Sequence, residues 1–109
     1  MKIFVETYNL IEGFHNWPDA PERYSYLGLR HRHQFELRCK FEVKHLDREI
    51  EVNYRQWDIS DFLHHKFGLP CEFGGMSCEQ IAEILMNEYP DCFSCTVLED
   101  GFGGATLTR

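Results

Sequence analysis

The sequence predicts an α+β protein whose elements follow the order strand, strand, helix, helix, strand, strand. Three observations carry this prediction. Polar and apolar residues alternate strictly over a long stretch of the first half, apolar residues recur at helical spacing in the middle, and alternation returns near the end. Because 109 residues suffice for one hydrophobic core, residues 1–109 are expected to form a single domain.

Two strands are expected in the first half of the chain. Residues 1–8 alternate between two faces, and residues 31–43 do so without interruption, with histidine and apolar residues on one face and polar or charged residues on the other. Residues 9–30 contain two prolines and two glycines, so we expect an irregular connection there. Residues 49–52 alternate again, which fits either a hairpin return or an extended continuation.

Two helices are expected in the middle of the chain. Asp58 is expected to cap the first helix, and Gly68 is expected to end it. Ser77 and Gln80 have the spacing of a capping box, which places the start of the second helix. An apolar stripe at helical spacing follows until Pro90 ends the segment.

The composition excludes several classes of protein. Lysine and arginine total 11 against 18 aspartates and glutamates, a net charge of −7, and no basic cluster occurs, so no nucleic-acid partner is expected. No long apolar run is present and the beginning of the chain does not resemble a signal peptide, so neither a membrane partner nor export is expected. Five cysteines, an odd number, favour reduced thiols and a cytoplasmic location.

The histidines are the most informative residues. His31 and His33 are two apart on a predicted strand, so both project from one face and can bind one ion together. His15 follows the first strand and is the natural third ligand of such a site. The alternative is that the pair are polar residues at a strand end. His64 and His65 fall late in the first predicted helix, where spacing alone indicates surface residues.

Glu99 stands out on the next predicted strand, residues 93–100, which is followed by a turn and a last strand over residues 105–108. Its neighbours on the same face are apolar, and a carboxylate there must be hydrogen-bonded, paired or at the edge of a pocket. Alternatively, the strand ends before Glu99, which would then be a solvated turn residue.

The element order, His15, the strand with His31 and His33, the helix start at residues 77–82 and the strand at residues 97–99 together resemble the 6-pyruvoyltetrahydropterin synthase and 6-carboxytetrahydropterin synthase family. The resemblance spans almost the whole chain. It implies a T-fold, an antiparallel four-stranded sheet with two helices on one face in the order ββααββ. It also implies a homo-oligomer with ligand sites between subunits.

The resemblance implies roles for four residues. His15, His31 and His33 would bind Zn²⁺, and Glu99 would accept hydrogen bonds from the N–H donors of a pterin or guanine-like ring. The metal would hold and polarise the side chain of that ligand.

The chain departs from the family at the proton-transfer residues. The family's cysteine, four residues before the His-x-His motif, corresponds to Leu27. Of the family's Asp-His pair only His65 matches, which makes it the remaining candidate for a catalytic acid or base. The acidic-aromatic pair at the first helix corresponds to Asn53 and Tyr54, so the acid is missing there as well.

These observations lead to a divergent, zinc-binding, pterin-synthase-like protein that binds a pterin or guanine-like small molecule. If it is an enzyme, the resemblance implies a lyase that catalyses metal-assisted elimination or rearrangement on the ligand's side chain. The alternative is a non-catalytic module that sequesters or senses a purine-like nucleotide, which the absence of the cysteine favours. A purely oligomeric scaffold is a third possibility.

Overall fold

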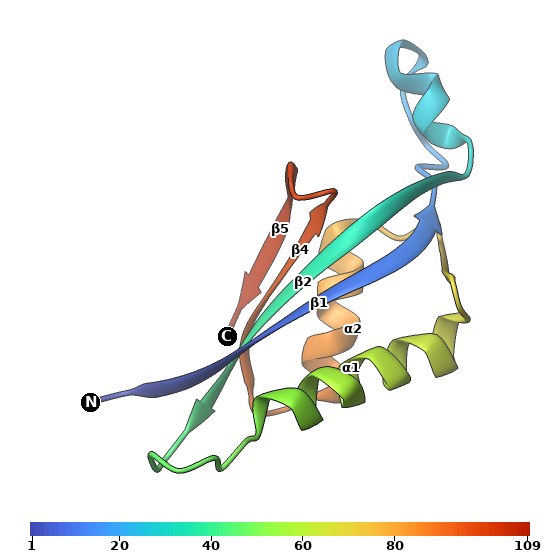
Figure 1. Ribbon diagram of the computed structural model, residues 1–109. Coiled ribbons are helices and arrows are strands. Elements are labelled where there is room, and N and C mark those ends of the chain that lie inside the picture. Colours follow the sequence, from blue (N-terminus) through green and yellow to red (C-terminus); the bar gives the residue numbers. More distant parts are fainter.

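A computed structural model describes residues 1–109 and shows an α+β arrangement in which two α-helices pack on one face of a five-stranded sheet (Figure 1). A short 3-10 helix, η1, lies in the connection between the first two strands. The elements in chain order are β1 (Ile3–His15), η1 (Glu22–Gly28), β2 (His31–Val43), α1 (Val52–Phe67), β3 (Cys71–Gly74), α2 (Cys78–Glu88), β4 (Cys92–Glu99) and β5 (Gly103–Thr108).

The long strands β1 and β2 form the centre of the sheet, whose strand order is β3-β1-β2-β4-β5. They pair antiparallel along their whole length, from Ile3 opposite Val43 to His15 opposite His31. β4 pairs antiparallel with β2, and β5 pairs antiparallel with β4. This register brings the end of β1 and the start of β2 together at one end of the sheet.

The expected four-stranded antiparallel sheet in the order ββααββ is wrong. β3 is a fifth strand that lies between α1 and α2 in the sequence. It pairs parallel with the end of β1, with Gly13 opposite Cys71. α1 leads the chain back along the sheet, so the segment that follows runs in the direction of β1 (Figure 1). β3 has only four residues, too few to show a periodic pattern in the sequence.

Two element boundaries also differ from expectation. Residues 9–15, expected to be irregular, continue β1. Residues 49–52 form no strand, because α1 begins there, and Glu51 is its N-cap, with a side chain that accepts a hydrogen bond from the backbone N–H of Tyr54. Asp58, expected to be the cap, therefore lies inside the helix.

The expected start of α2 is confirmed. Ser77 and Gln80 form a reciprocal capping box, in which each side chain accepts from the backbone N–H of the other residue.

The buried side chains of both helices meet those of the inner sheet face in one core. Its largest fully buried members include Ile11, Phe35, Leu37, Phe41, Ile59, Leu63, Ile81 and Leu85. Neither helix combines the length and apolar character needed to cross a membrane.

Candidate metal centre

Three histidine side chains converge where β1 ends and β2 begins. His15 is the last residue of β1 and lies opposite His31, the first residue of β2, while His33 lies two residues further along the same face. The ring centroids are 4.7 Å apart for His15 and His31, 5.2 Å for His15 and His33, and 4.9 Å for His31 and His33. One nitrogen from each ring lies within 4.8 Å of the other two, so the group can hold a metal ion.

Backbone carbonyls hold two of these rings. The Nδ1 of His15 is 2.8 Å from the carbonyl oxygen of Met76, in the loop before α2, and the Nδ1 of His31 is 2.8 Å from that of Leu29. A carbonyl oxygen only accepts, so Nδ1 carries the proton in both rings and donates it. In the neutral rings Nε2 therefore keeps its lone pair, which is the form that binds a metal.

A carboxylate holds the third ring. The Nδ1 of His33 is 2.6 Å from Oδ2 of Asp100, and Oδ1 of Asp100 accepts from the backbone N–H of Gln34 at 2.8 Å. The His33 hydrogen bond, together with that from Gln34, lowers the pKa of Asp100, so this carboxylate is ionised at neutral pH. Asp100 has a left-handed φ of 54° in the turn between β4 and β5, and this turn brings it to the ring.

The position of His15 in the core keeps its ring neutral. Its side chain is only 8% exposed, and burial lowers its pKa below the ordinary value, an effect that outweighs the opposing hydrogen bond to Met76 and the charge of Glu99. The ring packs edge-on against Phe35, with centroids 5.2 Å apart. His15 is therefore a rigid, uncharged donor at neutral pH.

Glu99, the last residue of β4, points its carboxylate at the histidines. Its Oε2 is 3.1 Å from Nε2 of His15, and its Oε1 is 3.7 Å from Nε2 of His33. The thiol of Cys78, the first residue of α2, lies 3.7 Å from Oε2, and burial followed by the charge of Glu99 raises the pKa of that thiol to about 12. The interpretation of Glu99 as a solvated turn residue is wrong, because Glu99 belongs to the strand and lines the histidine cluster.

A pocket of about 460 Å³ opens beside the cluster, and both His15 and Glu99 contribute to its wall. Trp17 and Leu27 line it from the connection between β1 and β2, which projects beyond the end of the sheet (Figure 1), and Met76 lines it from the loop before α2. These apolar side chains next to histidines and a carboxylate form a site suited to a small molecule with a flat apolar body and polar edges.

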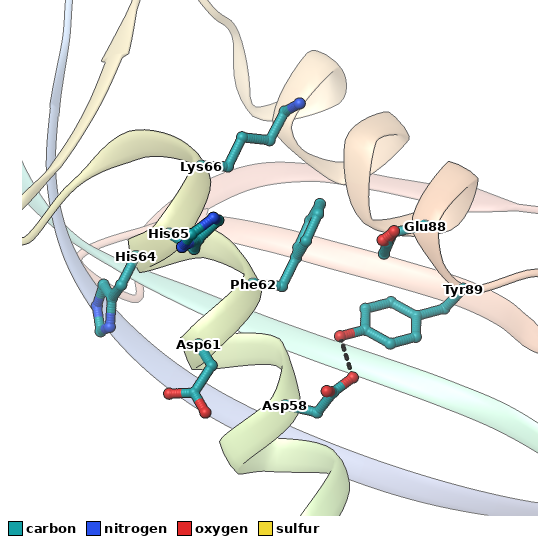
Figure 2. A pocket seen from close by; sticks show the side chains of 8 residues that line it. All are labelled: Asp58, Asp61, Phe62, His64, His65, Lys66, Glu88 and Tyr89. Atoms are coloured by element: carbon teal, nitrogen blue, oxygen red, sulfur yellow. Dashed lines mark hydrogen bonds between the residues drawn. The ribbon is translucent and has the colours of Figure 1, made fainter.

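His65 does not join this site within one chain. It lies with His64 in an open groove between α1 and the end of α2 (Figure 2), and that groove shares no lining residue with the pocket beside the histidine cluster. In the groove, the hydroxyl of Tyr89 donates to Asp58 at 2.6 Å, which links the two helices. The expectation that His65 acts as an acid or base at the metal is not supported by contacts within the chain.

Asp100 and Cys78 are residues of the site that the sequence analysis missed. In the sequence, Asp100 lies at the junction of a predicted strand and a turn, and nothing there indicates a second role. Cys78 falls on the apolar stripe of α2, and nothing in its spacing distinguishes it from a core thiol. The hydrogen bonds from the histidine rings to the backbone carbonyls of Met76 and Leu29 could not be predicted from the sequence, because every residue has a backbone carbonyl.

Comparison with known proteins adds no assignment. No family model matches the chain. No curated protein matches it either.

Replacing Asp100 with asparagine is expected to weaken metal binding without disturbing the turn, because asparagine tolerates the left-handed backbone conformation. Loss of a carboxylate that orients a ligating histidine typically costs about 10- to 100-fold in metal affinity. Competition of Asp100→Asn with a chromophoric zinc chelator measures this loss. Asp47→Asn, an exposed aspartate far from the cluster in sequence, is the control, and equal affinities for the two variants would contradict the role of Asp100.

Proposed function

We propose that this protein binds zinc through His15, His31 and His33 and binds a pterin- or guanine-like small molecule in the adjoining pocket. The observation that carries the zinc proposal is the hydrogen bonding of all three rings through Nδ1. This arrangement fixes the tautomer and turns each Nε2 into a metal donor, as in known zinc sites with three histidines. Zinc is favoured over magnesium or calcium, which prefer oxygen ligands.

The ligand proposal rests on the chemistry of the pocket. The carboxylate of Glu99 can accept two hydrogen bonds in a plane, which matches the adjacent amino and ring N–H donors of a pterin or guanine edge. Trp17 and Leu27 offer apolar surface to the ring itself. The sequence resemblance to the tetrahydropterin synthases supports the same class of ligand.

Calorimetry on the zinc-loaded protein tests this proposal with guanosine, pterin and adenosine as probes. Guanosine and pterin are expected to bind, whereas adenosine lacks the paired N–H donors and is not. In Glu99→Gln, the side-chain amide N–H faces an N–H donor of the ligand, so these polar groups are left unpaired. Each unpaired group is expected to weaken binding by about 1–3 kcal/mol. Glu79→Gln is the control, because the carboxylate of Glu79 lines the same pocket. Equal binding of guanosine and adenosine by the wild type would reject the ligand class.

Binding without catalysis is the form of this function that the residues favour. Leu27, an inert side chain, lines the pocket where the resemblance would place a thiol, and His65 lies in a separate groove. A module that sequesters or senses a purine-like nucleotide needs neither group.

A lyase reaction on the ligand's side chain is a second candidate, and the position of Cys78 favours it, with the thiol as a proton donor because its raised pKa keeps it protonated at neutral pH. Its thiol lines the pocket and lies beside Glu99, whereas Cys39 is buried against Cys95, with 3.6 Å between the two sulfurs. A turnover assay with dihydroneopterin triphosphate distinguishes the two functions. Turnover by the wild type that Cys78→Ser abolishes would establish the lyase, and no turnover with retained binding would establish the binding module.

A closed homo-oligomer is also part of the proposal. β3 and β5 are the two edges of the sheet, and unpaired strand edges are usually covered or paired. A partner copy could also bring a His65 groove to the pocket, which a single chain does not do. Light scattering at micromolar concentration is expected to give a mass above that of the 13.0 kDa chain, and a stable monomer would contradict the expectation.

A further inference from the structure

The carboxylate of Glu99 lies close to two histidine nitrogens as well as lining the pocket. Both of its oxygens face the cluster, one at 3.1 Å from Nε2 of His15 and the other at 3.7 Å from Nε2 of His33. Two donors bound tetrahedrally to one zinc ion at about 2.0–2.1 Å lie about 3.3–3.4 Å apart. Each Glu99 oxygen lies near this separation from the one histidine nitrogen that it faces, and the carboxylate has to move for one oxygen to bind an ion shared with all three rings.

The hydrogen bonds on the far side of the rings give an independent argument. Nδ1 of His15 donates to the Met76 carbonyl and Nδ1 of His33 donates to Asp100, so each neutral ring presents a lone pair at Nε2. Glu99 presents lone pairs to the same two nitrogens. Acceptors that face each other at 3.1 Å repel unless a cation lies between them, and either a proton on Nε2 or a metal ion can take that place. The carboxylate is therefore positioned to share a metal ion with His15.

The backbone around Glu99 holds it in this position. Glu99 pairs with Phe35 on β2 and with Gly103 on β5, so the strand that carries it has a neighbour on each side. The next residue, Asp100, orients His33. Glu99, the last residue of β4, and Asp100, the first residue of the turn that follows, therefore lie at the two ring nitrogens of His33.

We propose that Glu99 is a fourth protein ligand of the metal when the pocket holds no organic ligand. The centre is then a closed site of three histidines and one carboxylate, and no coordination position is left for water. This inference rests on the proposed function. It adds that a pterin- or guanine-like ligand has to draw Glu99 from the metal, because both carboxylate oxygens already face the cluster. Binding of that ligand therefore opens a coordination position.

Cobalt substitution tests this inference, because the visible absorption of Co²⁺ reports changes in its ligands. Azide serves as the probe, since it binds an open position and shifts the spectrum. Wild-type protein with one Co²⁺ per chain is expected to show no azide response, whereas Glu99→Ala is expected to respond, and acetate in place of azide is expected to restore a spectrum like that of the wild type. Glu99→Ala should also bind Co²⁺ at least about 10-fold more weakly.

Glu79→Ala is the matched control, because Glu79 lines the same pocket but forms no ion pair with a histidine, and it should behave as the wild type. Circular dichroism verifies the fold of each variant, and Glu99→Gln replaces Glu99→Ala if the latter does not fold. A wild type that binds Co²⁺ and responds to azide as strongly as the Glu99 variant would overturn the fourth ligand but leave the three-histidine centre. A wild type that binds no Co²⁺ would overturn the proposed function and this inference together.

Discussion

His31→Ala is expected to bind zinc at least about 100-fold more weakly than the wild type, since loss of a direct ligand should exceed the 10- to 100-fold effect of losing its hydrogen-bonding partner. His31 is half-buried at the start of β2, so its truncation removes a ligand without opening the core. Zinc titration against a chromophoric chelator measures the change.

His65→Ala is the matched control for His31→Ala. It removes an exposed histidine on α1 that lies in a different groove, so zinc affinity should not change. If both variants lost affinity equally, or if neither did, the assignment of His31 to the metal centre would be wrong.

Phe35→Ala is expected to lower the free energy of unfolding by about 3–5 kcal/mol, the usual cost of truncating a fully buried phenylalanine. Phe35 has no exposed surface, and its ring lies 5.1 Å from that of Phe73 and 5.6 Å from that of His33, measured between centroids. The ring also packs against His15, so the variant should hold the His15 ring of the metal centre less firmly. Urea denaturation of the metal-free protein isolates the effect on packing.

Phe102→Ala is the control for this measurement, because Phe102 is almost fully exposed in the turn before β5. A surface substitution of this kind usually changes stability by no more than about 0.5 kcal/mol. A decrease in the free energy of unfolding of less than about 1 kcal/mol for Phe35→Ala would contradict the burial of Phe35 in the core, because truncation of a buried phenylalanine usually costs more.

The strand that carries His31 and His33 could be predicted from the sequence because its physical cause is local. One face of β2 is buried along its length, so alternation of period two appears directly in residues 31–43. The convergence of His15 on this strand also followed from pairing of neighbouring strands. Neither inference required knowledge of the rest of the chain.

The second half of β1 could not be predicted, because its inward residues are set by contacts with distant elements. Asn9 is buried, yet its side-chain amide donates to the carbonyl of Gln56 and to the hydroxyl of Ser60 on α1. Gly13 is needed because a Cβ there would lie 2.7 Å from the ring of Phe73. A polar residue and a glycine interrupt the apolar pattern, so the segment looks irregular in the sequence.

The role of Asp100 was hidden for a similar reason. An aspartate followed by a glycine is a common turn signal, and the sequence alone gives no further meaning to it. Its contact with His33 depends on the register between β2 and β4, in which Phe35 lies opposite Glu99. Predicting this contact requires the pairing of β2 with β4, two strands that lie far apart in the sequence, and no local pattern indicates that pairing.

Elemental analysis of the wild-type protein, purified without chelators, shows whether the three histidines bind zinc. The convergence of three Nδ1-anchored histidines predicts one zinc ion per chain, retained through dialysis and removed only by a strong chelator. A wild-type protein that contains no metal, and that takes up none when dialysed against micromolar zinc, would show that His15, His31 and His33 form no metal centre.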